Sequence, residues 1–178
     1  DLRLICSQDY IDFSRDYFMA ASRGEVYSRS MDFPKFHSLD NLPRGRPGKL
    51  EVASRMMIGQ VKKAAELAVR DGEEIVICIG GNLHHAKPDY GEGFCIYNDN
   101  AFLAKYLLEE YGLERILLLD TDAHQGNGTC EYFYTDPRVL FVSFHLWPHY
   151  PGSGLPTELG EGPGRGYTIN VPFPHGTG

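Results

Sequence analysis

Residues 75–85 read IVICIGGNLHH, an apolar run that opens directly into two glycines and two adjacent histidines. Further apolar runs follow at residues 116–119, 139–144 and 167–171. Continuous apolar runs with little alternation are typical of strands buried on both faces, and helices between such strands make βαβ units. The sequence therefore predicts an α/β fold with a mainly parallel sheet.

Helical segments are predicted before and between these strands. Residues 50–70 repeat apolar side chains at helical spacing, and shorter helices are expected at 98–111 and 129–134. A weaker pattern predicts a helix at 9–22, whereas residues 42–48, with two prolines and two glycines, indicate a loop. A chain of this length accommodates one core, so we expect residues 1–178 to belong to a single domain.

Composition excludes several classes of function. The net charge is −7, from 24 acidic and 17 basic residues, which gives no basic surface for nucleic acid or an anionic membrane. No apolar run approaches the roughly 20 residues of a membrane helix, and the opening DLRLICSQDY lacks the layout of a signal peptide. The cysteines are scattered without a CxxC pair, so we expect free thiols. We therefore expect a cytoplasmic protein that binds neither nucleic acid nor a membrane directly.

Polar, glycine-rich segments follow three of the predicted strands. Ligands of parallel α/β sheets gather at the carboxyl ends of the strands, so these segments are where chemistry is expected. Asp122 and His124 follow one strand and offer an oxygen and an imidazole nitrogen, donors that suit zinc or another divalent metal. His84 and His85 follow another and offer a general base and a proton donor. Alone, each pair is more often ordinary loop structure, with Asp122 capping a turn, but their joint occurrence favours a metal-assisted hydrolase.

Five motifs, in this order and spacing, resemble the histone deacetylase superfamily, which includes the acetylpolyamine amidohydrolases. They are GGNLHHAKPDYGEGFCIYND (80–99), LLDTDAHQGNG (118–128), VSFH (142–145), YPGSG (150–154) and GYTINVPFPHGTG (166–178). HQGNG is similar to class IV and bacterial members. The resemblance is dense over residues 75–178, and it implies the arginase-deacetylase fold, a parallel sheet between helical layers, here incomplete at both ends.

The resemblance also implies the site. Asp122 and His124 would be zinc ligands. The catalytic histidines and their hydrogen-bond partners would be His84 with Asp120, and His85 with Asn127. Since Asp120 is a carboxylate that favours a charged imidazole, His85 beside a neutral amide should be the better base. The implied reaction is zinc-dependent deacetylation of acetyl-lysine or a related acetylated amine, in which His85 takes a proton from metal-activated water.

The surroundings of the site are implied in the same way. Gly93, Phe94 and Tyr150 would line a narrow tunnel for an acyl-lysine or acyl-amine chain of an acetylated protein or small amine. A structural monovalent cation such as K⁺ would lie beneath the zinc. Its ligands would be the backbone oxygens of Asp120, Asp122, His124 and Phe144, with the Ser143 hydroxyl. The sequence does not decide between a monomer and a homo-oligomer.

Two parts of the family pattern are missing from these 178 residues. They are a second aspartate ligand and a tyrosine in a Gly-Gly-Tyr segment; past His124 the only aspartate is Asp136. With two ligands, this chain alone is expected to bind zinc weakly. A non-catalytic or truncated remnant that keeps the site residues is therefore an alternative to an active deacetylase. An arginase-like two-manganese hydrolase is a third reading, but it would call for more aspartates near His124.

Overall fold

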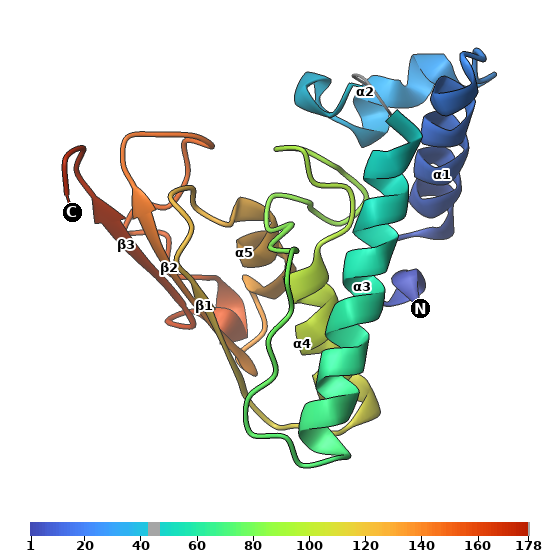
Figure 1. Cartoon of the computed structure of the whole chain (residues 1–178). Helices are drawn as coiled ribbons and strands as arrows, with labels where there is room; N and C mark the ends of the chain where they lie inside the picture. Colours follow the sequence, from blue (N-terminus) through green and yellow to red (C-terminus); the bar gives the residue numbers. More distant parts are fainter. Residues whose placement is uncertain (43–46, 178) are drawn as a thin grey trace.

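A three-stranded parallel sheet forms one side of the molecule. The computed structural model describes residues 1–42 and 47–177 (Figure 1). Strands β1 (Ile116–Asp120), β2 (Val139–Leu146) and β3 (Thr168–Phe173) are adjacent in that order, and both pairs are parallel. The predicted α/β fold and the strands expected at 116–119, 139–144 and 167–171 are confirmed. The predicted loop at 42–48 lies largely outside the described residues.

The helices and the inner face of the sheet together enclose the buried core. The helices are α1 (Gln8–Arg23), α2 (Phe33–Phe36), α3 (Pro47–Val69), α4 (Asp99–Glu110) and α5 (Asn127–Phe133), with short 3₁₀ turns at Leu2–Leu4, Ser30–Asp32, Leu39–Asn41 and Gly162–Gly164. The four helices that the sequence predicts correspond to α1, α3, α4 and α5. Of the helices described, none is both long and apolar enough to cross a membrane.

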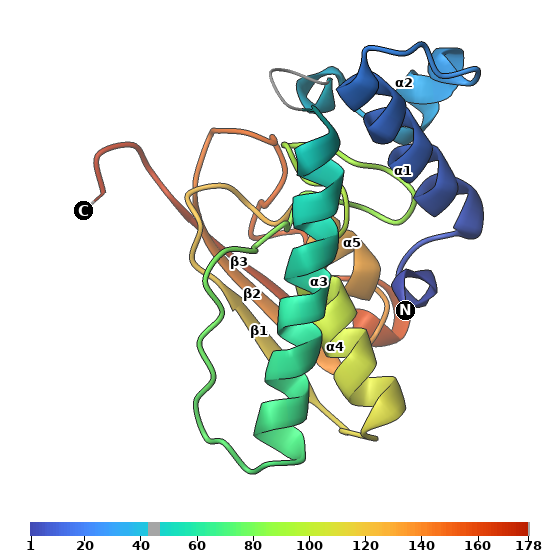
Figure 2. The same ribbon diagram turned by 45° about the vertical axis from the view of Figure 1, so that its right-hand side comes forward.

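In the described part of the chain, the helices lie on one side of the sheet. Helices α5 and α4 lie next to the strands, with α3 and α1 farther out (Figures 1 and 2). The other face of the sheet carries apolar side chains that stay exposed, at 60% for Leu117, 57% for Leu119 and 41% for Ile169. The inward-facing side chains of β1, Ile116 and Leu118, pack against the core.

The segment predicted as a first strand is different. Residues 75–79 form no strand, and alternate side chains point into solvent, with Ile75, Ile77 and Ile79 81–86% exposed. The prediction of a strand buried on both faces is therefore wrong for the described structure. The physical reason is that, among the described residues, nothing pairs with this backbone or covers the outward-facing isoleucines.

Much of the core comes from the N-terminal third, where the sequence signal is weak. Helix α1 begins at an N-cap, Ser7, whose hydroxyl accepts a hydrogen bond from the Tyr10 amide, and it ends at Gly24 in the left-handed conformation. Its buried aromatic face packs on the next turns of the chain, with the Phe13 and Phe36 rings 4.6 Å apart. Burial in this aromatic cluster lowers the pKa of His37 to about 3.

Asn98 connects α4 to the loop that carries the paired histidines. Its side-chain oxygen accepts from the Ala101 amide at the start of α4 at 2.9 Å. Its side-chain nitrogen donates to the Ala86 carbonyl at 2.9 Å and to the Thr129 hydroxyl at 3.1 Å. The side chain is fully buried, so no water can replace these bonds.

We expect Asn98→Ala to lower the free energy of unfolding by about 2–3 kcal/mol, because it removes a helix cap and leaves buried polar groups without partners. Urea unfolding followed by circular dichroism measures the change. The matched control is Asn100→Ala on the same helix. In the described part of the chain, the Asn100 side chain forms one hydrogen bond, to Asn82 at the surface, so its loss should cost about 0.5 kcal/mol or less. Equal losses in the two variants would contradict this role of Asn98.

Candidate functional site

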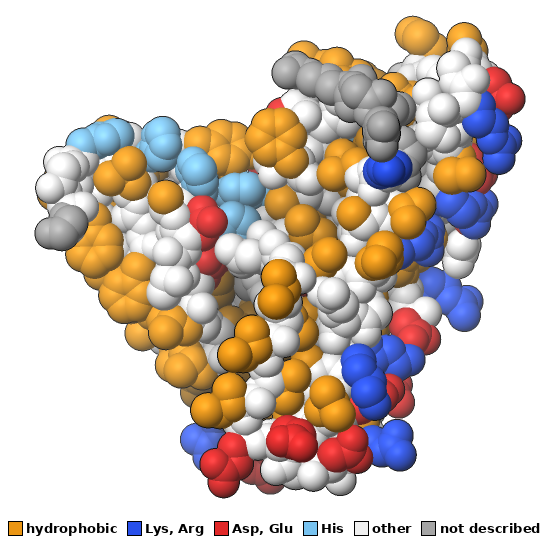
Figure 3. Space-filling model, viewed as in Figure 1, with side chains coloured by type: hydrophobic (Ala, Val, Ile, Leu, Met, Phe, Trp, Pro, Cys, Tyr) orange, Lys and Arg blue, Asp and Glu red, His pale blue; other side chains and the backbone are white. Residues whose placement is uncertain are grey.

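The carboxyl ends of β1 and β2 open into a cavity of about 600 Å³. Its lining includes residues from the loops after residue 80 and after β1, and from the segment that follows β2. The residues are Asp40, Asn82, Leu83, His84, His85, Gly93, Phe94, Cys95, Asp122, His124 and Tyr150. Figure 3 shows that histidine side chains gather along the upper edge of the molecule, next to acidic ones. The structure thus brings the predicted histidine pair and both predicted metal ligands to one place.

His84 is held by Asp120, the last residue of β1. The His84 Nδ1 and Asp120 Oδ2 atoms are 2.6 Å apart, and both side chains are almost completely buried. The second carboxylate oxygen of Asp120 accepts from the Asp122 amide at 3.1 Å, so Asp120 also shapes the loop after the strand. This is the pairing that the sequence predicts.

His85 is held by Asn127, the first residue of α5. The His85 Nδ1 and Asn127 Oδ1 atoms are 2.7 Å apart, and the ring of His84 lies 4.1 Å from that of His85, centroid to centroid. Burial lowers the pKa of His85, the charge of His84 lowers it further, and the hydrogen bond to Asn127 opposes both. A lowered pKa keeps the imidazole neutral near pH 7, the form that a general base requires.

Two glycines let the chain pass close to these histidines. A Cβ on Gly93 would lie 2.4 Å from His85 Cδ2, and the Gly93 backbone has a φ of +58°. A Cβ on Gly128 would lie 2.3 Å from the Ala86 carbonyl oxygen. Gly93 of the GEGFC motif and Gly128 of the HQGNG motif are therefore required by their close contact with residues 84–86.

Asp122 and His124 lie in the loop after β1 with half-exposed side chains. Asp122 Oδ1 accepts from the His124 amide at 2.8 Å and lies 3.1 Å from His124 Nδ1. Partial burial raises the pKa of Asp122, but the bond from the His124 amide and the charge of His84 outweigh it, so the pKa is lowered. A charged carboxylate beside an imidazole is a donor set that fits zinc.

A third protein ligand is not found near this pair. Within residues 1–42 and 47–177, no group of three or more histidine, cysteine, aspartate or glutamate side chains could hold a metal ion. Asp136 forms an ion pair with Arg138 at 2.6 Å. Glu158 accepts from the Gly154 and Leu155 amides, so its carboxylate is occupied in its own loop. The described residues thus offer two neighbouring side chains for a metal, whereas a typical catalytic zinc site has three protein ligands.

The residues predicted for a monovalent cation lie under the same loop. Asp120 and Ser143 are direct partners in the register of β1 and β2, and Phe144 follows on β2. The Ser143 side chain is fully buried, with its hydroxyl 3.0 Å from His145 Nδ1. The ladder therefore places Asp120 beside Ser143; their role as cation ligands stays a prediction.

Phe94 and Tyr150 lie at the opening of the cavity. Phe94 is 65% exposed, and the Tyr150 ring meets the His85 ring edge-on at 4.9 Å between centroids. Gly93 and these two aromatic side chains all contribute to the cavity lining. The arrangement places an aromatic wall beside the predicted base, as the tunnel hypothesis expects.

Sequence reasoning gave no role to two carboxylates that shape the site. Asp99 is buried and accepts from the Asn82 and Leu83 amides at 2.9 and 2.7 Å, which fixes the loop just before His84. Asp40 accepts from the Gly93 amide at 2.8 Å. Asp99 ends the GFCIYND motif, whose helix-start pattern could have indicated a structural carboxylate, whereas nothing local to Asp40 indicates its distant partner.

Comparison with known proteins agrees with this geometry. The Histone deacetylase domain profile matches residues 1–178. A "Probable deacetylase" from Archaeoglobus fulgidus is 49% identical over 120 residues, 67% of this chain and 33% of that protein. The "Acetoin utilization protein AcuC" of Staphylococcus aureus (strain COL) is 39% identical over 176 residues, 97% of this chain and 43% of that protein.

Solved structures give the same result. The crystal structure of a histone deacetylase homologue from Aquifex aeolicus superposes with a TM-score of 0.80 and 29% identity, covering 97% of this chain and 45% of that one. A second structure, of such a homologue complexed with SAHA, superposes equally well. The chain thus spans less than half the length of these relatives. From sequence and structure together, the chain belongs to the histone deacetylase family.

Proposed function

We propose that this site takes part in zinc-dependent hydrolysis of an acyl amide, with His85 as the general base. The single observation that carries the proposal is the pairing of adjacent histidines with different partners, His84 with Asp120 and His85 with Asn127, in the cavity that contains Asp122 and His124. The two imidazoles thus have different partners: the Asp120 carboxylate orients His84, whereas His85 faces a neutral amide and its burial lowers its pKa, which leaves it neutral and able to accept a proton.

Asp122 and His124 would hold the zinc. The lowered pKa of Asp122 and the closeness of the two side chains fit a divalent cation, and a third ligand would come from outside the described residues. When bound, zinc supplies Lewis acidity that polarises the acyl carbonyl and acidifies water. A monovalent cation such as K⁺ held by Asp120, Ser143 and Phe144 would support the loop from below.

His85 takes a proton through Nε2, because Nδ1 is engaged by Asn127. The Asp120 carboxylate holds His84 through Nδ1. The other ring nitrogen, Nε2, lies 3.9 Å from Asp122 Oδ1 and so points toward the proposed metal position, where it would donate a proton to the departing amine. The two carboxylate oxygens of Asp120 are engaged by His84 and the Asp122 amide, so only its backbone oxygen is left for the monovalent cation. That engagement argues against Asp120 as a ligand of a second metal in an arginase-like site.

The substrate class follows from the opening. Gly93, Phe94 and Tyr150 would admit an extended acyl-lysine or acyl-amine chain, whose apolar methylenes suit aromatic walls. An acetylated protein or a small acetylated amine would serve, and the net charge of −7 favours neither nucleic acid nor an anionic membrane as a partner. A non-catalytic remnant with the same side chains would bind an acylated chain without turnover, so zinc-dependent hydrolysis of an acetyl-lysine peptide by the protein would rule the remnant out.

In a preparation that hydrolyses an acetyl-lysine peptide, His85→Ala should lower kcat about 10²–10⁴-fold, because it removes the proton acceptor. Zinc content should change little, since Asp122 and His124 remain. Initial rates and metal analysis on the same sample measure both. His175→Ala is the matched control, because His175 is an exposed histidine whose one hydrogen bond among the described residues goes to the Pro148 carbonyl. Near-normal turnover by His85→Ala with zinc bound would refute the base assignment.

Asp120→Asn should lower activity about 10–100-fold, the usual effect of losing an outer-shell partner, while zinc is retained. The reason is that asparagine keeps the shape of the side chain but loses the charge that orients His84. Asp122→Ala is the comparison, and it should lose zinc. If Asp120→Asn lost zinc to the same extent, Asp120 would itself be a ligand and the two-metal hydrolase would be favoured.

A further inference from the structure

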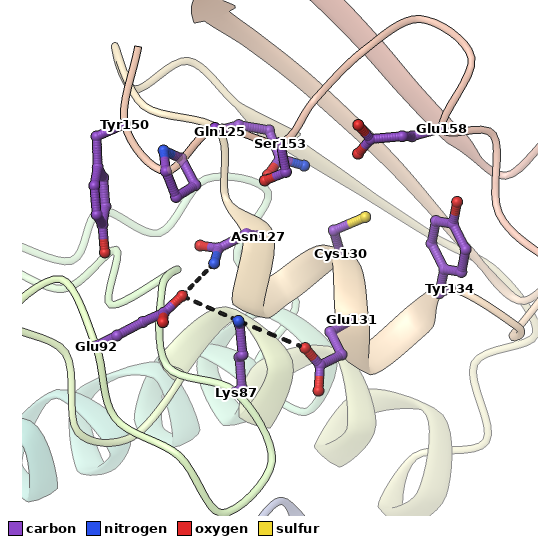
Figure 4. A pocket seen from close by; sticks show the side chains of 12 residues that line it. Lys87, Glu92, Gln125, Asn127, Cys130, Glu131, Tyr134, Tyr150, Ser153 and Glu158 are labelled. Carbon is purple, nitrogen blue, oxygen red and sulfur yellow. Dashed lines mark hydrogen bonds and ion pairs between the residues drawn. The ribbon is translucent and has the colours of Figure 1, made fainter. Parts of the chain in front are cut away.

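A second pocket lies directly behind the predicted base. It has a volume of about 500 Å³, and its lining includes Lys87, Glu92, Asn127, Glu131 and Tyr150 (Figure 4). Asn127 belongs to both regions, because its side chain lines this pocket and its amide oxygen faces His85. A change in this pocket can therefore reach the catalytic cavity through one amide group.

Three charged or polar groups in the pocket form a chain of contacts. The Asn127 side-chain nitrogen donates to Glu92 Oε1, and the Lys87 ammonium lies 3.2 Å from the same oxygen. The Glu92 side chain is only 16% exposed, so its charge needs these partners. Figure 4 shows the Glu92 carboxylate pointing at both Asn127 and Lys87.

The backbone directs Glu92 toward this position. The Glu92 carbonyl accepts from the Cys95 amide at 2.9 Å, which closes a tight turn, and the next amide, that of Gly93, is fixed by Asp40. Glu131 lies at the outer end of the chain, 4.0 Å from Lys87, with a side chain that is 53% exposed. Glu92 is thus the carboxylate in contact with Asn127, whereas Glu131 reaches only the lysine.

The direction of the Asn127 amide follows from the chemistry of its two neighbours. A carboxylate only accepts hydrogen bonds, so the nitrogen end of the amide must face Glu92 and its oxygen end must face His85. An amide oxygen also only accepts, so His85 Nδ1 must carry the hydrogen. The Nε2 atom is then left with the lone pair that a base needs. Without Glu92, the amide could turn around and stabilise the opposite tautomer.

We propose that Glu92, held by Lys87, is a positioning residue that fixes the Asn127 amide and thereby the tautomer of His85. The inference rests on the proposed function for its effect on turnover, but the tautomer is a property of the protein alone. Glu92 does not touch the reacting atoms, and it acts through two hydrogen bonds in series.

The test combines kinetics with a spectroscopic reading of the tautomer in Glu92→Ala. Long-range ¹H–¹⁵N spectra of ¹⁵N-histidine-labelled protein, assigned with His85→Ala, show which ring nitrogen of His85 carries the hydrogen. We expect the parent to hold it on Nδ1 and Glu92→Ala to populate the Nε2–H form. In the same variant kcat should fall about 10–100-fold with little change in KM.

Three further variants make the result specific. Glu92→Gln keeps an acceptor oxygen and should restore both the tautomer and most of kcat. Glu92→Met keeps the length of the side chain but has no strong hydrogen-bond acceptor, so it repeats the comparison if the alanine variant does not fold. Glu131→Gln is the matched control at the other contact of Lys87, and it should behave like the parent.

The outcomes separate this inference from the proposed function. An unchanged Nδ1–H tautomer in both Glu92→Ala and Glu92→Met would overturn the inference, as would a changed tautomer with unchanged kcat. Absence of hydrolysis by a preparation in which a third ligand completes the zinc site would instead overturn the proposed function, and the tautomer comparison would still decide the role of Glu92.

Discussion

The hydrogen bond between His84 and Asp120 is the contact on which the rest of the site depends. It joins the glycine-rich loop after residue 80 to the end of β1, two segments 36 residues apart, at 2.6 Å in an almost fully buried position. Removing one member of such a buried pair typically costs about 3–5 kcal/mol, because the other is left without a partner. The chain must therefore bring the loop and the strand end together whenever it folds, and the predicted metal ligands follow directly after that strand end.

The surrounding structure supports this contact from several directions. Asp99 fixes the loop before His84, Asn98 ties the same segment to α4, and the ladder between β1 and β2 sets Asp120 beside Ser143. The site is thus built on rigid elements, while Phe94 and Tyr150 stand at its exposed opening. This division suits the proposed hydrolysis, in which the reacting groups need fixed geometry and the rim needs only to admit a chain.

The sequence predicts what depends on local pattern and fails where distant contacts decide. Apolar runs and turn residues predicted α4, β1, β2 and β3 because their burial follows a regular period. The positions of the polar segments after the strands predicted that the two histidine-containing segments meet, and the family resemblance implied their hydrogen-bond partners. Residues 75–79 have the same apolar character but form no strand, since pairing depends on a neighbour that the run itself does not encode. Asp40 and Glu92 were given no role for the same reason, as their partners, the Gly93 amide and Asn127, are defined only by the folded chain.

The central claim is that Asp122 and His124 hold the metal while His84 and His85 stay free for proton transfer. The most direct measurement is a crystal structure of the protein grown with enough zinc to fill a weak two-ligand site, with anomalous data collected at the zinc absorption edge. The account predicts one strong anomalous peak about 2.0–2.2 Å from an Asp122 oxygen and a His124 nitrogen, with His84 still bonded to Asp120 and His85 to Asn127. A zinc peak bonded to His84 or His85, or no peak beside Asp122 and His124, would contradict it.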